Sequence, residues 1–145
     1  MDIEQVIDHI QNRSYMSGVD RDRARIKARG EVFTPDSLAN EVIESTIDIM
    51  TDKEKTNFVD SVWVDPAMGD GSLLGAVIIA KMKQGASFIE AITTVKGYDI
   101  EKSNIDEAIK RLGCGNDEAT QILKKNLICQ NAGTIFNNNF GALFE

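Results

Sequence analysis

The sequence contains few of the residues that mark metal-binding or disulfide-bonded proteins. It has two prolines, two cysteines and one histidine among 145 residues. No apolar run approaches the roughly 20 residues that a membrane-spanning helix requires. Cys114 and Cys129 form neither a metal-binding spacing nor a disulfide framework, and Met1 to Glu4 lacks the basic and apolar regions of a signal peptide. We therefore expect a cytoplasmic protein with reduced thiols, no membrane contact and no metal site.

Positive charge is also scarce. The chain has 16 Lys and Arg against 23 Asp and Glu, a formal net charge of −7 at pH 7. A stand-alone DNA-binding protein usually has a basic surface, so this balance argues against tight nucleic-acid binding by the whole chain. The exception is a basic segment made of Arg21, Arg23, Arg25, Lys27 and Arg29. Two interpretations stay open: a solvated helix face or flexible arm, and a local patch for nucleic-acid phosphate or an acidic partner.

The hydrophobic content, 42 % of the chain, is sufficient for one globular domain with a core. We divide the chain into residues 1–30, an N-terminal helix with the basic segment, and residues 31–145, the main domain. Apolar residues at helical spacing predict an amphipathic helix over residues 3–17. Thr34 and Pro35 predict the N-cap and the first position of a second helix. That helix is expected to turn the following residues toward the core: Leu38, Val42, Ile43, Ile47 and Met50.

Strands and helices alternate in the rest of the main domain. Short buried strands are predicted at 62–64, 94–100 and 127–130, helices from 72, at 88–92, at 101–112 and at 117–125, and a polar loop at 51–60. This order predicts an α/β fold with parallel strands and right-handed crossovers. Ligands of such sheets bind beyond the carboxyl ends of the strands. We therefore expect residues 65–71, Asp99 and Asn131 to converge on one crevice.

The segment from Val62 to Leu74 organises this domain, as a strand, a loop with Gly69 and Gly71, and a helix from Ser72. Glycines let a backbone approach a ligand closely, and a helix start offers free N–H donors. A nicotinamide fingerprint would need a third glycine where Leu74 stands, and the Gly-Lys-Ser/Thr of a triphosphate loop is absent. The loop alone therefore predicts a nucleotide-like cofactor without identifying it.

Four segments carry motifs that occur together in one family. Residues 65–71 read Asp-Pro-Ala-Met-Gly-Asp-Gly, and residues 32–35 before them read Val-Phe-Thr-Pro. Residues 97–100 read Gly-Tyr-Asp-Ile, and residues 127–132 read Leu-Ile-Cys-Gln-Asn-Ala. In this order they resemble the adenine-N6 DNA methyltransferases, including type I modification subunits, whose loop is Asp-Pro-Ala-Cys-Gly-Thr/Ser-Gly. The resemblance covers residues 29–132 and implies a partial Rossmann-like sheet of the class I methyltransferase type, with flanking helices.

The cofactor of that family, S-adenosylmethionine, would find a partner for each of its chemical groups. The resemblance implies that Asp99 holds the ribose hydroxyls, that Asp65 takes the ammonium, and that Asn131 meets the adenine amino group. Phe33 would lie near the sulfonium, Tyr98 or Ile100 would stack on adenine, and helix starts at Thr34 or Ser72 would meet the carboxylate. The alternative for Asp99 is a helix N-cap for residues 101–112. The predicted cofactor-binding residues are Phe33, Thr34, Pro35, Asp65, Ala67, Gly69, Gly71, Ser72, Asp99, Ile100 and Asn131.

The catalytic motif of the family, Asn/Asp-Pro-Pro-Tyr/Phe, is missing. It holds and stacks on the flipped target base, and both prolines of this chain, Pro35 and Pro66, belong to other motifs. We therefore assign no catalytic residue. The chain stops at Glu145, about where a fourth strand would begin, so an exposed sheet edge is expected. A homodimer, a partner chain that completes the sheet, or a longer gene product would satisfy that edge.

Three functions follow as hypotheses. The first is an S-adenosylmethionine-binding part of a truncated or split methyltransferase, which methylates DNA only together with a completing chain. The second is a non-catalytic accessory or decoy module that acts on a restriction-modification complex. The third is a different reaction on the same cofactor, such as its cleavage. A thiol could serve that reaction, but Cys129 is predicted to lie in a buried strand and to contribute packing.

Overall fold

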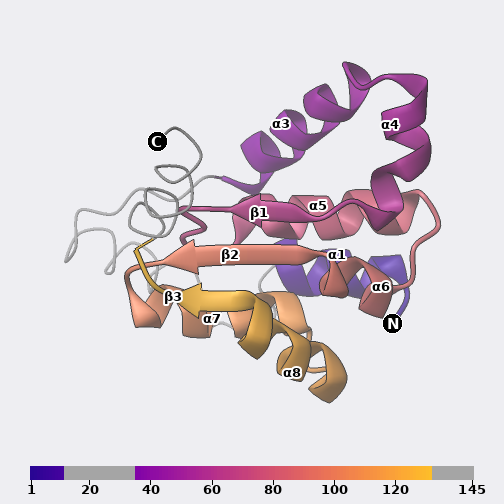
Figure 1. The fold of residues 1–145 in the computed structure, drawn as a ribbon. Coiled ribbons are helices and arrows are strands. Elements are labelled where there is room, and N and C mark those ends of the chain that lie inside the picture. Colours follow the sequence, from indigo (N-terminus) through magenta and orange to yellow (C-terminus); the bar gives the residue numbers. More distant parts are fainter. Residues whose placement is uncertain (12–34, 132–145) are drawn as a thin grey trace, which may run out of the picture.

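The computed structural model describes residues 1–11 and 35–131 of the chain. The basic segment, Phe33, Thr34 and the segment 132–145 lie outside the described residues. Within them the fold is α/β, as predicted, with helices packed on a three-stranded parallel sheet (Figure 1). The strand order is β1-β2-β3, and the strands are β1 (Trp63–Asp65), β2 (Val95–Asp99) and β3 (Leu127–Cys129).

The helices predicted after β1 are present, with boundaries displaced by at most one residue, the first helix begins at Ile3 as predicted, and residues 12–17 of its predicted span lie outside the described residues. Their bounds are α1 (Ile3–Gln11), α3 (Asp36–Asp48), α4 (Asp52–Asn57), a 3-10 turn η1 (Phe58–Asp60), α5 (Ser72–Lys83), α6 (Phe88–Thr93), α7 (Lys102–Gly113) and α8 (Asp117–Asn126). In the part of the chain that the structure describes, no helix combines the length and the apolar character needed to cross a membrane.

The core lies between the sheet and the helices on one of its faces. Helix α5 is buried on nearly every side, because it packs against the sheet, α1 and α3 at once. Its Gly75 allows a close approach of α1: a Cβ there would lie 2.8 Å from Ile10 Cγ2. In β2, Val95 and Gly97 face these helices and are buried, whereas Lys96 between them is exposed.

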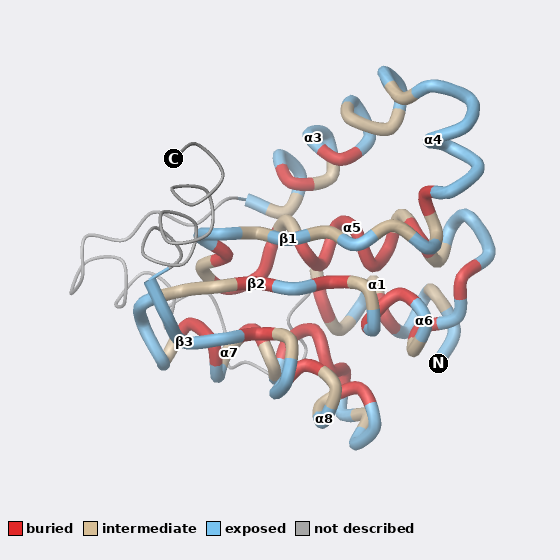
Figure 2. The backbone as a smooth tube through the Cα atoms, viewed as in Figure 1, coloured by how far each residue is buried: buried red, intermediate tan, exposed pale blue. Residues whose placement is uncertain are grey.

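The opposite face of the sheet has no described element over it (Figures 1 and 2). Val64 is 45 % exposed and Ile128 39 % exposed, and Val62 just before β1 is 59 % exposed. The prediction of a buried strand at 62–64 is therefore wrong for the side chains of Val62 and Val64. Parallel sheets are normally covered on both faces, and helices of the described residues cover only one.

Two predictions about the segment before β1 are corrected. Residues 51–60 were expected to form a loop, but Thr51 and Glu54 form a capping box that starts α4. Helix α3 begins at Asp36 with Pro35 as its extended N-cap residue, one position later than expected. It buries the stripe of Ala39 and Ile43 against α5, so that Leu38 and Val42, predicted as core, are about half exposed.

Lys81 is buried in α5, where its ammonium group meets the amino ends of β1 and β2. Its Nζ donates to the Ser61 carbonyl oxygen and, at 2.6 Å, to Thr94 Oγ1. It also lies 5.7 Å from the centroid of the Phe58 ring. Burial lowers the pKa of Lys81 to about 8, and the nearby charge of Asp60 opposes that shift.

Relative to a Lys81→Met variant, the protein should gain stability as the pH rises from about 8 toward 10.5. In this range the folded lysine has released a proton that the unfolded lysine, with an ordinary pKa of 10.5, still binds. The unfolded state then binds more protons, so the free energy of unfolding increases with pH. Urea unfolding near pH 7 and near pH 10 measures the difference. Lys83→Met, an exposed change on the same helix, is the control. If the free energy of unfolding changes equally between the two pH values for wild type and for Lys81→Met, the prediction is wrong.

Candidate functional site at the carboxyl ends of the strands

The carboxyl ends of β1 and β2 meet through the glycine loop, residues 65–71. The Met68 N–H donates to the Tyr98 carbonyl oxygen at 3.0 Å, and the Gly69 N–H donates to Asp99 Oδ2 at 3.1 Å. On the other side, the Gln130 N–H donates to the Asp99 carbonyl oxygen at 2.9 Å. The structure thus brings the loop, Asp99 and the chain leading to Asn131 together, as the strand order predicts.

Asp99 is at the centre of this arrangement. Besides the Gly69 N–H, its carboxylate accepts the Glu101 N–H at 2.8 Å and Asn104 Nδ2 at 3.2 Å, both on Oδ1. The N-cap residue of α7 is Glu101, whose side chain makes no capping bond. The alternative that Asp99 is the N-cap of this helix is therefore wrong. Asp99 instead fixes the turn between β2 and α7 and joins that turn to the glycine loop.

Asp65 places a second carboxylate beside Asp99. Its Oδ1 accepts the Ala67 N–H at 3.1 Å, which bends the chain into the loop. Burial raises the pKa of the Asp65 carboxyl, the bond from Ala67 lowers it, and the negative charge of Asp99 raises it further. Burial and the charge of Asp99 both disfavour the charged form of Asp65, and a cationic group bound here would offset both effects. The end of β1 therefore favours a positively charged ligand group.

Backbone conformation explains the two loop glycines. Gly69 has φ 55° and Gly71 has φ 86°, both in the left-handed region that side-chain-bearing residues avoid. Gly71 also lies against α7, since a Cβ there would be 3.2 Å from Leu112 Cδ1 and 3.3 Å from Ala108 Cβ. The left-handed turn at Gly71 leads directly into α5, which starts at Ser72 as predicted.

A buried arginine that the sequence analysis did not single out holds the loop from behind. Arg111 of α7 is 1 % exposed. Its Nη1 donates to Ser72 Oγ at 2.9 Å and lies 3.3 Å from Asp70 Oδ1, and its Nη2 pairs with Asp36 at the start of α3. Its Nε donates to the Ile10 carbonyl oxygen at 2.8 Å. One guanidinium therefore joins α1, α3, α7 and the loop.

Arg111, Asp70, Asp36 and Ser72 form an arginine cluster. The Ser72 hydroxyl is occupied within it, because it accepts from Arg111 and donates to Asp70 Oδ1 at 3.0 Å. Any contact of Ser72 with a ligand would therefore come from its backbone. Pro35 is exposed next to Asp36, and Ala67 is exposed in the loop. Ile100 follows Asp99 with 69 % of its side chain exposed, and Asn131 is exposed after β3. Phe33 and Thr34 lie outside the described residues.

The two thiols differ in exposure, and the prediction for Cys129 is wrong. Cys129, expected in a buried strand, is exposed, because it lies at the carboxyl end of β3, an edge strand of the described sheet. It is aligned with Asp99 in the β2–β3 pair, and its Sγ lies 3.5 Å from the Ile100 carbonyl oxygen. Cys114 is buried at the end of α7, and burial raises the pKa of its thiol to about 12.

A thiol reagent should therefore modify Cys129 rapidly near pH 8 and leave Cys114 intact in the folded protein. The attacking species is the thiolate, and the Cys114 thiol is both inaccessible and protonated at that pH. Titration with a disulfide reagent, with the modified residue located by peptide mass mapping, measures the two rates. A Cys129→Ser variant is the control, and rapid labelling of that variant while folded would contradict the prediction.

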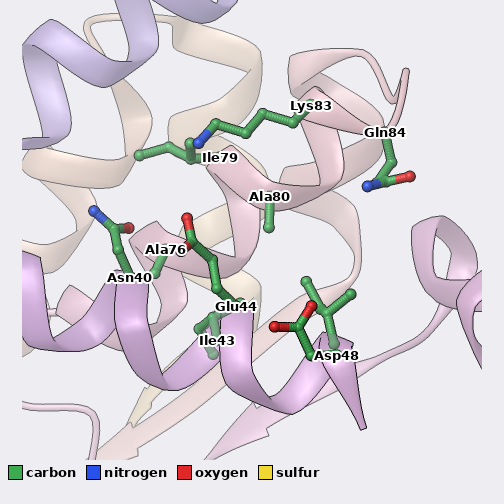
Figure 3. A pocket seen from close by; sticks show the side chains of 10 residues that line it. Asn40, Ile43, Glu44, Asp48, Ala76, Ile79, Ala80, Lys83 and Gln84 are labelled. Carbon is green, nitrogen blue, oxygen red and sulfur yellow. The ribbon is translucent and has the colours of Figure 1, made fainter. Parts of the chain in front are cut away.

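A groove of about 200 Å³ lies away from this site, between α3 and the second half of α5 (Figure 3). Its apolar floor includes Ile43 and Ile79, and Glu44, Asp48 and Lys83 contribute polar groups. None of the predicted cofactor-binding residues lines it. Among the described side chains there is also no group of three or more His, Cys, Asp or Glu arranged to hold a metal ion.

Comparison of the chain with protein families, with curated proteins and with solved structures finds no match.

Proposed function

We propose that the chain is the S-adenosylmethionine-binding half of a Rossmann-like class I methyltransferase of the adenine-N6 DNA type. The observation that supports this most is the bond between Gly69 of the loop and Asp99 at the end of β2. It joins a glycine loop, a helix start and an acidic residue at the carboxyl edge of a parallel sheet, where ligands of such sheets bind.

Asp99 has the chemistry to bind a ribose. A carboxylate offers about four acceptor sites, and the donors from Gly69, Glu101 and Asn104 use one site on Oδ2 and two on Oδ1. Oδ2 can therefore accept one ribose hydroxyl directly. A second hydroxyl would bind when the Gly69 N–H moves away from Oδ2, so that the ligand takes the place of the loop contact.

The remaining groups of the cofactor match neighbouring features. The pair of carboxylates, Asp65 and Asp99, favours the ammonium group near the end of β1. The start of α5 offers N–H donors for the carboxylate. Ile100 presents an exposed apolar surface next to the ribose site, suitable for the adenine ring. Asn131, following the neighbouring strand, carries an amide that can pair with the adenine edge.

Methyl transfer would require a second chain or segment in this proposal. The family motif that holds the target base is absent from the sequence, and one face of the described sheet exposes Val62, Val64 and Ile128. Apolar residues on the open face of a parallel sheet favour burial under further elements. We propose that a homodimer or a partner chain covers them in a cytoplasmic restriction-modification system, and that DNA binds only to the completed assembly.

Titration calorimetry with S-adenosylmethionine and with S-adenosylhomocysteine tests the binding. We expect heat with both ligands and slower labelling of Cys129 in their presence, since this thiol is aligned with Asp99; Cys114 serves as the internal control. If neither ligand gives heat and neither slows the labelling of Cys129, the proposal is overturned.

Mass spectrometry of the ligand and of DNA after incubation distinguishes the functions. Unchanged cofactor and unmethylated DNA are expected for the chain alone. Methylated DNA would show that the isolated chain is catalytic, and cleaved cofactor would favour a different reaction. Binding without turnover in the presence of a candidate partner would favour an accessory module.

A further inference from the structure

Asn104 is buried, with 4 % of its surface exposed, in the first turn of α7, shortly after the end of β2. Its Nδ2 donates to Asp99 Oδ1 at 3.2 Å. Among the described residues, its Oδ1 is buried and has no hydrogen-bond partner. The contact with Asp99 fixes the orientation of the Asn104 amide, because the reverse orientation would place Asn104 Oδ1 against Asp99 Oδ1, and both are acceptors.

An unpaired buried acceptor destabilises a fold, and an apolar residue of similar size would remove it. The gain that the structure shows for Asn104 is the bond to Asp99. Asp99 is half-buried and also accepts the Glu101 N–H on the same oxygen. Two donors on Oδ1 restrict the rotation of the carboxylate, so that Oδ2 points toward the Gly69 N–H of the loop.

We infer that Asn104 is a positioning residue, which orients the Asp99 carboxylate for a ligand that carries a ribose diol. This inference rests on the proposed function and adds a residue to it. Asn104 acts through Asp99 and does not itself touch the ligand. A residue retained for this purpose should contribute to affinity at the expense of stability, whereas a structural asparagine should contribute to stability.

The experiment compares Asn104→Leu with the parent protein, using S-adenosylhomocysteine and its 3′-deoxy analogue as probes. We expect roughly tenfold weaker binding of S-adenosylhomocysteine, because a carboxylate that is no longer held in orientation would lose about the net value of one hydrogen bond to the ribose. We expect a smaller change for the 3′-deoxy analogue, because it lacks one hydroxyl that Asp99 would bind. The thermal midpoint should stay the same or rise. In an Asp99→Ala background, Asn104→Leu should cause no further loss, which a double-mutant cycle measures.

Asn126→Leu is the matched control. Its Nδ2 donates to the Thr93 carbonyl oxygen at 3.3 Å, near the amino end of β2, and its replacement should leave both affinities unchanged. If the parent protein does not bind S-adenosylhomocysteine, the proposed function and this inference both fall. If the parent binds and Asn104→Leu binds equally well, the inference alone is overturned. A thermal midpoint lowered by several degrees in Asn104→Leu, or equal losses for both ligands, would show a structural role and would also overturn it.

Discussion

Arg111→Met should lower the free energy of unfolding by about 3–5 kcal/mol, the usual cost of removing one partner from a buried ion pair. The variant keeps an unbranched apolar stem and loses the guanidinium with every donor. Asp70, with 8 % of its side chain exposed, would keep its charge near the core without the guanidinium. Ser72, the Ile10 carbonyl and Asp36 would lose a partner in the same step. Urea unfolding followed by circular dichroism measures the change.

Lys110→Met is the control for this variant, because Lys110 is the exposed neighbour on α7 and surface changes usually shift stability by less than about 0.5 kcal/mol. Adding Asp70→Asn to Arg111→Met should recover part of the loss, since it removes the buried negative charge that the guanidinium faces in the parent protein. A loss below about 1 kcal/mol for Arg111→Met, or no recovery in the double variant, would show that the four contacts are not coupled through the guanidinium.

Asp99→Ala should weaken the binding of S-adenosylhomocysteine by about 1–3 kcal/mol, which corresponds to roughly fivefold to 150-fold. The variant removes the oxygen proposed to accept a ribose hydroxyl, and it also releases Gly69 from the end of β2. The affinity loss should therefore be accompanied by faster hydrogen exchange at the Gly69 amide. Calorimetry and exchange measured by NMR provide the two readouts.

Asp106→Ala serves as the comparison, because Asp106 is an exposed acidic residue of α7 outside the site. It corrects for the change of net charge that both variants share. Unaltered affinity in Asp99→Ala, with faster exchange at Gly69, would reduce Asp99 to a residue that supports the turn and the loop. In that case the proposed ribose contact would be wrong.

Local patterns were sufficient to predict the order of strands and helices. The apolar run of α5, the apolar stripe of α7 and the strand-helix alternation depend on neighbours a few residues apart. The meeting of the glycine loop with Asp99 was also predictable, because parallel strands bring their carboxyl ends to one edge. The capping box of Thr51 and Glu54 was readable in the same way, and its omission made α4 a loop in the prediction.

The arginine cluster depends on contacts that no local pattern contains. Arg111 does fall on the inward stripe of α7, three residues after the buried Ala108, and a charged residue there indicates a partner. Which partners it meets depends on how α1 and α3 approach the loop, and that is decided by packing across the whole core. The exposure of Cys129 was mispredicted for a related reason: it lies at the carboxyl end of an edge strand, and how far the helices extend over that end is also decided by packing.

The fit between Met68 and Gly97 links two positions of the predicted cofactor motifs. Met68 is buried, and a Cβ at position 97 would come within 2.5 Å of its Sδ and 3.0 Å of Leu74 Cδ1. The two residues therefore share one volume, and the side chain allowed at 97 is conditional on the one present at 68. A smaller residue at 68, such as the cysteine of the resembling family, would remove the 2.5 Å contact, and alanine at 97 would then need small shifts at Leu74 Cδ1 and at the Cβ of residue 68, 3.2 Å away, whereas methionine at 68 restricts that position to glycine.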